Sequence, residues 1–364
     1  NNNGKIINII QKEVAGENIL HIKGIVAPGF INAHCHLELS HLKNKIKTHT
    51  GLPEFIKQVI SLREANQDII FEAIEKEEQY MYNHGIVAVG DICNVLDTLQ
   101  QKSKKKLDYY NFIEAFDLKE NMSETMYNTA IKNQQIFINA GLEACVVPHA
   151  PYTVSDKLFK LLSTKYKSNT ISIHNQESIA EKDFLKNHTG SFAALFQFLN
   201  LKTNHLLKTG KSSIESTYKY LQDAKNVIFV HNSFTTETDI KIAIQEIKNS
   251  FWCICIKANL YIENTIPPIS LLKKNNAQIV VGTDSLSSNN QLCILEELKT
   301  IRTHFPTIPT IEILKWATKN GAKALQMENK FGTIEIGKTP GIVAIEGLDE
   351  NNEITKHSTI KRII

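Results

Sequence analysis

The sequence predicts an α/β fold: a (β/α)8 barrel with a small β-sandwich built from both chain ends. Eight short apolar runs alternate with longer amphipathic stretches over about 300 residues, which is the order of a barrel of β-then-α units. Several runs, such as 227–230 and 279–281, are continuously apolar, as is typical of strands buried on both faces. Eight units favour a closed barrel over an open, doubly wound sheet.

The barrel elements follow one another in a regular order. The expected strands lie at 25–33, 86–93, 109–115, 143–149, 170–174, 226–231, 251–257 and 278–284. The clearest expected helices, which begin with capping residues, lie at 68–83, 123–139, 156–167 and 236–248. This alternation predicts that residues 28–330 form the barrel.

Two terminal segments do not fit the barrel. Residues 5–10 and 19–25 have the composition of short strands, and residues 331–364 alternate strand-like runs with glycine-containing turns. Neither segment is long enough to bury a core alone. We therefore expect residues 1–27 and 331–364 to form one small β-sandwich domain beside the barrel.

Composition limits the function classes. The 364 residues carry 41 Lys and Arg against 38 Asp and Glu, a net charge of +3 that predicts neither a nucleic-acid partner nor a membrane partner. No apolar run approaches the ~18–20 residues of a membrane span, and the Asn-rich start does not resemble a signal peptide. Six cysteines are too sparse for a disulfide scaffold. We expect a cytoplasmic protein with a small-molecule partner.

Ligand-type residues stand at the ends of four expected strands. His34 and His36 are two residues apart, so the period of a strand points both imidazoles the same way. His174, His231 and Asp284 close three later strands. Any one of these is weak by itself, but strand ends meet at one rim of a barrel, where active sites form. The set predicts a site for a metal such as zinc or iron.

These residues carry a family resemblance. The segment 28–38 (PGFINAHCHLE), together with His174, His231 and the segment 282–285 (GTDS), resembles the amidohydrolase superfamily over nearly the whole chain. The segment 174–177 (HNQE) is similar to the deaminase group of that superfamily. The segment 148–153 (PHAPYT) resembles the branch of adenosylhomocysteine deaminases, aminofutalosine deaminases and chlorohydrolase-like enzymes.

The resemblance implies one divalent cation, zinc in preference to iron. Its implied ligands are His34, His36, His174 and Asp284, while His231 orients the attacking water or ligates, as in some members. Binuclear members carry a bridging lysine on the fourth strand, and residues 143–148 contain none. Glu143 or Cys145 is the alternative bridge, and the mononuclear site is the preferred interpretation.

The resemblance also implies catalytic and substrate-binding roles. Glu177 is the expected general acid, with a helix-starting carboxylate as the alternative. Asp284 would take the proton of the attacking water. His149 is expected to contact substrate, unless it is a core histidine, and Glu64 to bind ribose hydroxyls, unless it lies on an exposed helix face.

A few polar or sulfur-containing residues near these motifs remain open. Glu38 and Ser40 either line the pocket or cap the loop after the histidine pair, and Cys253 and Cys255 are expected to fill the core.

The predicted activity is metal-dependent hydrolytic deamination of an adenine-nucleoside-type or related heterocyclic amine, with release of ammonia. The alternatives are hydrolysis of another bond, as in chlorohydrolases or cyclic amidases, and a catalytically silent metal-binding barrel. No Gly-x-Ser-x-Gly elbow or phosphate-binding glycine loop points elsewhere. The sequence leaves a homodimer open.

Overall fold

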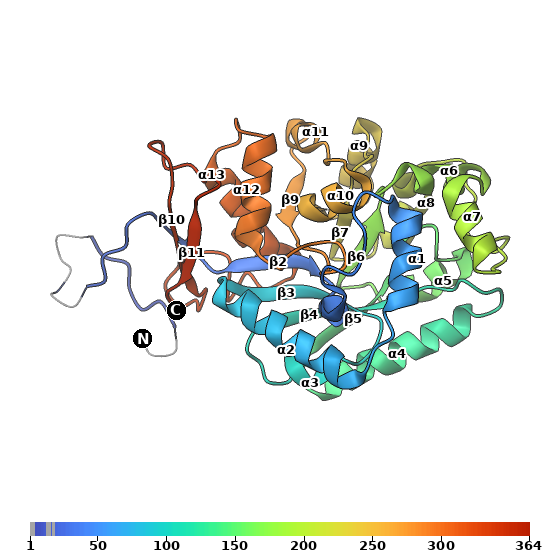
Figure 1. Cartoon of the computed structure of the whole chain (residues 1–364), viewed down its shortest axis with the longest axis horizontal. Coiled ribbons are helices and arrows are strands. Elements are labelled where there is room, and N and C mark those ends of the chain that lie inside the picture. The colour runs from blue at the N-terminus through green and yellow to red at the C-terminus, as the bar shows by residue number, and fades with distance from the viewer. Residues whose placement is uncertain (1–3, 12–15, 17–18) are drawn as a thin grey trace.

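Parallel strands form the centre of the molecule (Figure 1). The computed structural model describes residues 4–11, 16 and 19–364. The strands form two parallel sheets ordered β2-β3-β4-β5 and β6-β7-β8-β9. Their bounds are β2 Phe30–Cys35, β3 Ile86–Cys93, β4 Asp108–Ala115, β5 Glu143–Pro148, β6 Thr170–Asn175, β7 Asn226–His231, β8 Ser250–Ile254 and β9 Gln278–Val281.

The two sheets join into one barrel at both edges. The amide of His174 in β6 donates to the carbonyl of His149, the residue after β5, over 3.0 Å. On the opposite side Cys35 and Asp284 form a parallel bridge. The predicted (β/α)8 architecture is confirmed, with eight strands in the two parallel sheets of the described residues.

Helices surround the strands and bury one face each. Side chains cap the starts of some of them: Ser212 and Thr236, for example, form reciprocal capping boxes with Glu215 and Asp239. The helical elements are η2 Leu37–Leu42, α1 Leu52–Leu62, α2 Gln67–Asn83, α3 Leu99–Lys102, α4 Ser123–Asn139, α5 Asp156–Ser163, α6 Ile179–Asn187, α7 Gly190–Phe198, α8 Ser213–Leu221, α9 Glu237–Glu246, α10 Ile256–Glu263, α11 Ile269–Lys274, α12 Ile294–His304, α13 Thr310–Lys315, η3 Trp316–Asn320 and α14 Gly321–Ala324. No helix in the described part of the chain is long and apolar enough to cross a membrane.

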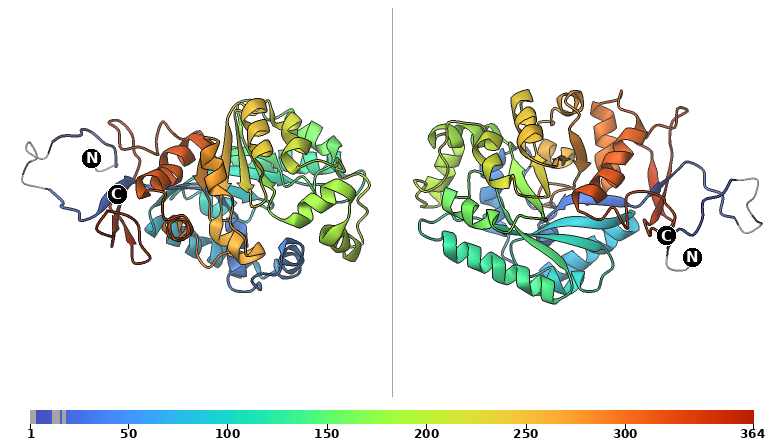
Figure 2. Two further views of the ribbon diagram at one scale, coloured as in Figure 1. Left: turned by 90° about the horizontal axis from the view of Figure 1, so that it is seen from above. Right: turned by 180° about the vertical axis from the view of Figure 1, so that it is seen from behind.

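A separate antiparallel sheet lies at one end of the molecule, away from α6 and α7 (Figure 2). It is built from both chain ends, as predicted. Among the described residues it has three strands in one layer, in the order β1-β10-β11. They are β1 Ile25–Pro28, β10 Ile342–Glu346 and β11 Thr359–Arg362.

The expected first barrel strand, 25–33, is in fact two strands in different sheets. Gly29 separates them: its amide donates to the carbonyl of Pro340 over 3.1 Å, and a Cβ there would lie 2.3 Å from a methyl of Val87. The expected strand 251–257 ends at Ile254, because α10 begins two residues later. β9 likewise stops at Val281, before the Gly-Thr-Asp turn.

The strands expected at 5–10 and over most of 19–25 do not form in the described residues. Ile6 exchanges two backbone hydrogen bonds with residues 337 and 338, and no ladder continues from it. The side chains of Ile7, Ile9 and Ile10 are more than half exposed. Strand-like composition is insufficient here because the pairing at Ile6 does not extend into a ladder.

Candidate metal centre and active site

The C-terminal ends of β2, β6, β7 and β9 bring the predicted ligand residues together. The Asp284 Oδ1 lies 3.6 Å from the Nε2 of His34 and 3.5 Å from the Nε2 of His36. The Nε2 atoms of His36 and His174 are 3.2 Å apart. His34, His36 and His174 form one buried group whose candidate ligand atoms lie within 4.8 Å of one another, and His34, His231 and Asp284 form a second.

Two of these imidazoles are oriented by acceptors behind them. The Nδ1 of His174 donates to the carbonyl of His149 over 2.9 Å, with the Glu114 Oε1 at 3.3 Å. The Nδ1 of His231 donates to the amide oxygen of Asn259 over 3.0 Å. Because these partners only accept, each imidazole carries a proton on Nδ1 and turns its Nε2 towards the centre, as metal-ligating histidines do.

The donor set fits a divalent cation. Both ring nitrogens of His34 are buried and have no hydrogen-bond partner among the described residues. Burial lowers the pKa of His36 to about 3 and that of His231 to about 3, so both imidazoles keep a free lone pair. Burial opposes ionisation of Asp284, but the surrounding histidines hold its pKa below the usual value. Neutral imidazoles with one carboxylate suit zinc or iron.

Glu177 lies beside this cluster, on the turn between β6 and α6. Its Oε1 is 3.6 Å from the Nε2 of His231, and the side chain is buried. Burial raises the pKa of Glu177 well above its usual value. Glu181 is the carboxylate in the first turn of α6, and it accepts from the amides of Gln176 and Glu177 over 3.0 and 3.1 Å. Glu181 therefore occupies the helix-starting position, which leaves the Glu177 carboxyl free to face the centre.

Three residues of the site have left-handed backbone conformations. The φ angles are 49° at Gln176, 75° at His231 and 56° at Asp284. Non-glycine residues adopt this region rarely, and where it persists the surrounding structure must enforce it. The turns at His231 and Asp284 thus direct these two side chains into the cavity at some cost in backbone energy, whereas the Gln176 side chain bonds to Asp239 and Thr235.

A cavity of about 350 Å³ opens onto the cluster. His36, His174, His231, Asp284 and Glu177 all line it. Its volume lies in the range of small-molecule sites. Its other walls come from the loops after β4 and β5 and from helices α1 and α7.

The two predicted substrate-binding residues differ in position. His149 lines the cavity and is half-buried, with its Nδ1 2.7 Å from the Thr153 hydroxyl. Glu64 is exposed and lines only an adjoining pocket. The preceding residue, Arg63, lines both.

Glu38, unlike Glu64, is buried and lines the cavity. Its Oε2 accepts from the amides of Asn94 and Val95 over 3.0 and 3.2 Å. Its Oε1 lies 3.7 Å from the Arg63 Nη2 and has no hydrogen-bond partner in the described part of the chain. Ser40, by contrast, caps the loop through the carbonyl of Leu37.

The two alternative bridging residues and the two expected core cysteines have different surroundings. Glu143 is exposed at the start of β5, the end of the strand remote from the centre, and Cys145 is buried with its thiol on the carbonyl of Val146. Neither belongs to a candidate ligand group of the described residues. Cys253 and Cys255 are buried core residues, as expected, and the chain's cysteines are all free.

Sequence reasoning missed several supporting residues. Glu114 beside His174 stands in an expected strand, and its position at the strand's polar end was the available signal. Asn259 orients His231, and the hydroxyl of Ser288 donates to the Asp284 Oδ2. No local pattern distinguishes these two from ordinary loop or helix residues.

A buried ion pair supports the turn after His36. The Asp91 Oδ1 accepts from the amide of Leu37 over 2.8 Å, and its Oδ2 lies 2.5 Å from the Lys102 Nζ. Lys102 also donates to the Asn111 Oδ1 over 2.7 Å, and both charged side chains are fully buried. The pair links α3 to the strand end that carries the histidines.

Replacing Lys102 by Met should therefore destabilise the protein strongly, by about 3–5 kcal/mol, because it leaves the Asp91 charge buried and unpaired. Urea unfolding measures the loss. The double variant Asp91→Asn/Lys102→Met should recover part of it. Lys104→Met, which removes an exposed ion pair with Glu75, is the control and should change little. Equal losses of unfolding free energy in Lys102→Met and Lys104→Met would contradict the prediction.

The chain matches the model of the amidohydrolase family over residues 25–363. It belongs to the amidohydrolase family. An adenosine deaminase of Helicobacter pylori is 27% identical over 350 residues, covering 93% of this chain and 82% of that protein. An aminodeoxyfutalosine deaminase of Nitratiruptor is 29% identical over 351 residues, covering 92% and 82%.

A solved structure shares the fold. The aminofutalosine deaminase of Helicobacter pylori in complex with methylthio-coformycin aligns with a TM-score of 0.78 and 23% identity, covering 93% of this chain and 86% of that one. The predicted resemblance is confirmed. The family and its named deaminases make the chain a hydrolase of carbon–nitrogen bonds other than peptide bonds, and family members bind a divalent metal.

Proposed function

We propose that the protein is a hydrolytic deaminase that replaces the exocyclic amine of an adenine nucleoside with oxygen and releases ammonia. The observation that carries this is the buried Glu177 carboxyl, which faces the histidine and aspartate cluster from the wall of the same cavity. The named activities of the relatives support the same class of substrate. Residues 28–330 would form the catalytic domain, and residues 1–27 with 331–364 the smaller one.

His34, His36, His174 and Asp284 would hold one divalent cation, with zinc favoured over iron. Such a cation lowers the pKa of a coordinated water from 15.7 towards about 7 and so makes hydroxide available at neutral pH. The absence of a lysine on β5 and the remote position of Glu143 support a single cation.

The side chains around the cavity divide the proton transfers. His231, held by Asn259, would orient the attacking water through its Nε2, and the Asp284 carboxylate would accept the water's proton. Glu177 would protonate the ring nitrogen next to the attacked carbon, then take up the proton of the newly added hydroxyl group and pass it to the departing amine. His149 would contact the substrate on the adjoining wall.

A screen of purine nucleosides for ammonia release tests the activity. The change from the adenine to the hypoxanthine chromophore should accompany it in equal amount. Release of chloride from a chlorinated heterocycle without deamination of any nucleoside would favour the chlorohydrolase alternative. If the cation-bound protein turned over no compound in the panel, the result would favour the alternative of a catalytically silent metal-binding barrel.

Binding of the ribose hydroxyls can be assigned by comparing two carboxylates. If Glu38 accepts from them, Glu38→Gln should raise KM for a nucleoside by about 10-fold or more and leave the free base less affected, since a hydrogen bond to a charged group contributes about 1.5–3 kcal/mol. Glu64→Gln is the matched change on the exposed residue. A selective effect at Glu64 and none at Glu38 would restore the sequence-based assignment.

A further inference from the structure

The two walls of the cavity differ chemically. The wall formed by the strand ends carries the histidines and carboxylates of the cluster. The opposite wall is almost wholly apolar and comes from two helices that lie beside each other over the barrel (Figure 1), α1 and α7. It includes Phe55, Ile56, Val59, Leu195, Phe196 and Leu199.

This apolar wall offers no free positive charge. Among the described lining residues Arg63 is the one lysine or arginine, and its Nη2 lies 3.7 Å from the Glu38 Oε1. A carboxylate of a ligand placed under α1 and α7 would lose its hydration without gaining a counter-ion. Such desolvation is costly, whereas an apolar group there is favoured by burial.

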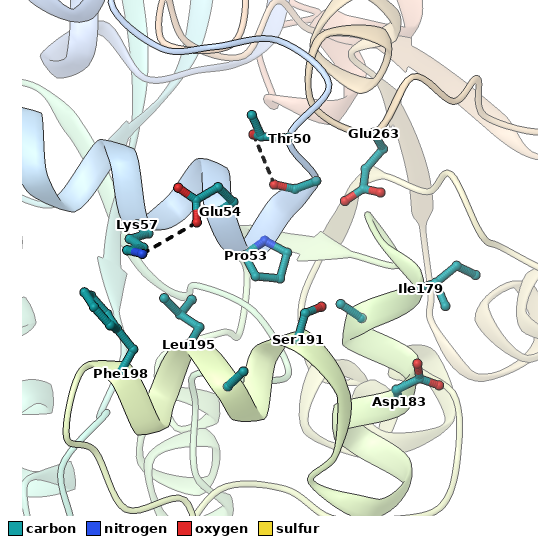
Figure 3. A pocket seen from close by; sticks show the side chains of 13 residues that line it. Thr50, Pro53, Glu54, Lys57, Ile179, Asp183, Ser191, Leu195, Phe198 and Glu263 are labelled. Atoms are coloured by element: carbon teal, nitrogen blue, oxygen red, sulfur yellow. Dashed lines mark hydrogen bonds and ion pairs between the residues drawn. The ribbon is translucent and has the colours of Figure 1, made fainter.

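The far side of the same helices is acidic. Leu195 also lines an outer pocket of about 510 Å³, which Figure 3 shows between α1 and the segment from Ile179 to Phe198. Glu54, Asp183 and Glu263 line this pocket, and its lysine, Lys57, lies 3.8 Å from Glu54. A ligand group long enough to pass Leu195 would therefore meet carboxylates.

The reaction fixes which end of a nucleoside lies under the helices. The carbon that bears the amine must reach the cluster at the strand ends, so the 5′ substituent, at the other end of the molecule, extends towards α1 and α7. We propose that the cavity selects adenine nucleosides whose 5′ substituent is uncharged and apolar, and disfavours those ending in a carboxylate. This inference rests on the proposed deaminase activity. It specifies the 5′ substituent, which differs among the substrates that the relatives are named for.

Two pairs of substrates test the selection on the metal-loaded protein. S-adenosylhomocysteine and 5′-methylthioadenosine share the thioether and differ in the amino-acid end, and we expect kcat/KM to favour the methylthio compound by about 100-fold. Adenosine and 5′-deoxyadenosine differ in one hydroxyl, and we expect about a 10-fold preference for the deoxy compound. Equal rates within the first pair, or faster turnover of S-adenosylhomocysteine, would overturn the inference.

A charge placed on the apolar wall provides an independent check. Val59→Lys puts an ammonium group on the cavity face of α1 and should reduce the preference for the methylthio compound at least 10-fold. Ser61→Lys adds the same charge to an exposed position of α1 outside the cavity lining, and it should leave the ratio unchanged. If Val59→Lys and Ser61→Lys changed the ratio of the two kcat/KM values equally, contact of the 5′ substituent with the apolar wall would not explain the preference.

The failure of the inference differs from the failure of the proposed function. Deamination of the nucleosides without the expected preference removes only the selection by the apolar wall. Deamination of no adenine nucleoside in the wider screen overturns the proposed function, and the inference with it. Should Val59→Lys fold poorly, the ratio measured with the unaltered protein decides the matter by itself.

Discussion

Glu177→Gln should lower kcat for deamination by about 10²–10⁴-fold, while the folded protein keeps its cation. The amide has nearly the same shape, and the amide N–H of residue 177 still donates to Glu181. It cannot, however, deliver a proton to the ring nitrogen and pass another to the leaving amine. Steady-state kinetics and metal analysis of the purified variant measure the two quantities.

A substrate with a different leaving group separates the two proton transfers. A 6-chloropurine nucleoside loses chloride, which departs unprotonated, so Glu177→Gln should slow its hydrolysis less than deamination. Some loss remains because the ring nitrogen still lacks its donor. Glu237→Gln, at the first residue of α9 and outside the cavity lining, is the control and should change neither rate. Near-normal deamination by Glu177→Gln, or an emptied metal site, would refute the assignment of Glu177 as proton shuttle.

Asp284→Asn should abolish measurable turnover and weaken retention of the cation. The carboxylate lies 3.5–3.6 Å from the Nε2 atoms of His36 and His34, and it is the one acidic member of the proposed ligand set. Asparagine tolerates the left-handed backbone at this position, so the change tests the charge and leaves the turn intact. Metal content after dialysis against a chelator and kcat are the measurements.

Ser288→Ala is the matched variant for Asp284, because it removes only the hydroxyl that donates to the carboxylate. A loss of about 10-fold in activity or affinity is expected, in line with other outer partners of metal ligands. The unaltered protein should hold about one equivalent of cation. Two tightly bound equivalents that depend on Glu143 or Cys145 would overturn the single-cation proposal, and full activity of Asp284→Asn would remove Asp284 from the site.

Much of the site follows from local sequence. The spacing of His34 and His36 places both imidazoles on one side of a strand, whatever the rest of the chain does. The continuously apolar strands predict burial on both faces, and eight such units favour a barrel, whose geometry brings His174, His231 and Asp284 to the same rim. These deductions depend on the two-residue period of a strand and on one rule about barrel ends, so sequence by itself determined them.

The rest was decided by contacts between residues far apart in the chain. Glu114 supports His174, and Asn259 supports His231, because strands and helices from different units pack together, and no local period records that packing. Glu38 lines the cavity from η2, whereas Glu64 lies beyond the end of α1 with its side chain exposed, and no local pattern separates these two positions. The apolar wall exists only where α1 and α7 meet. Its chemistry, and with it the proposed choice of substrate, is a property of the assembled tertiary structure.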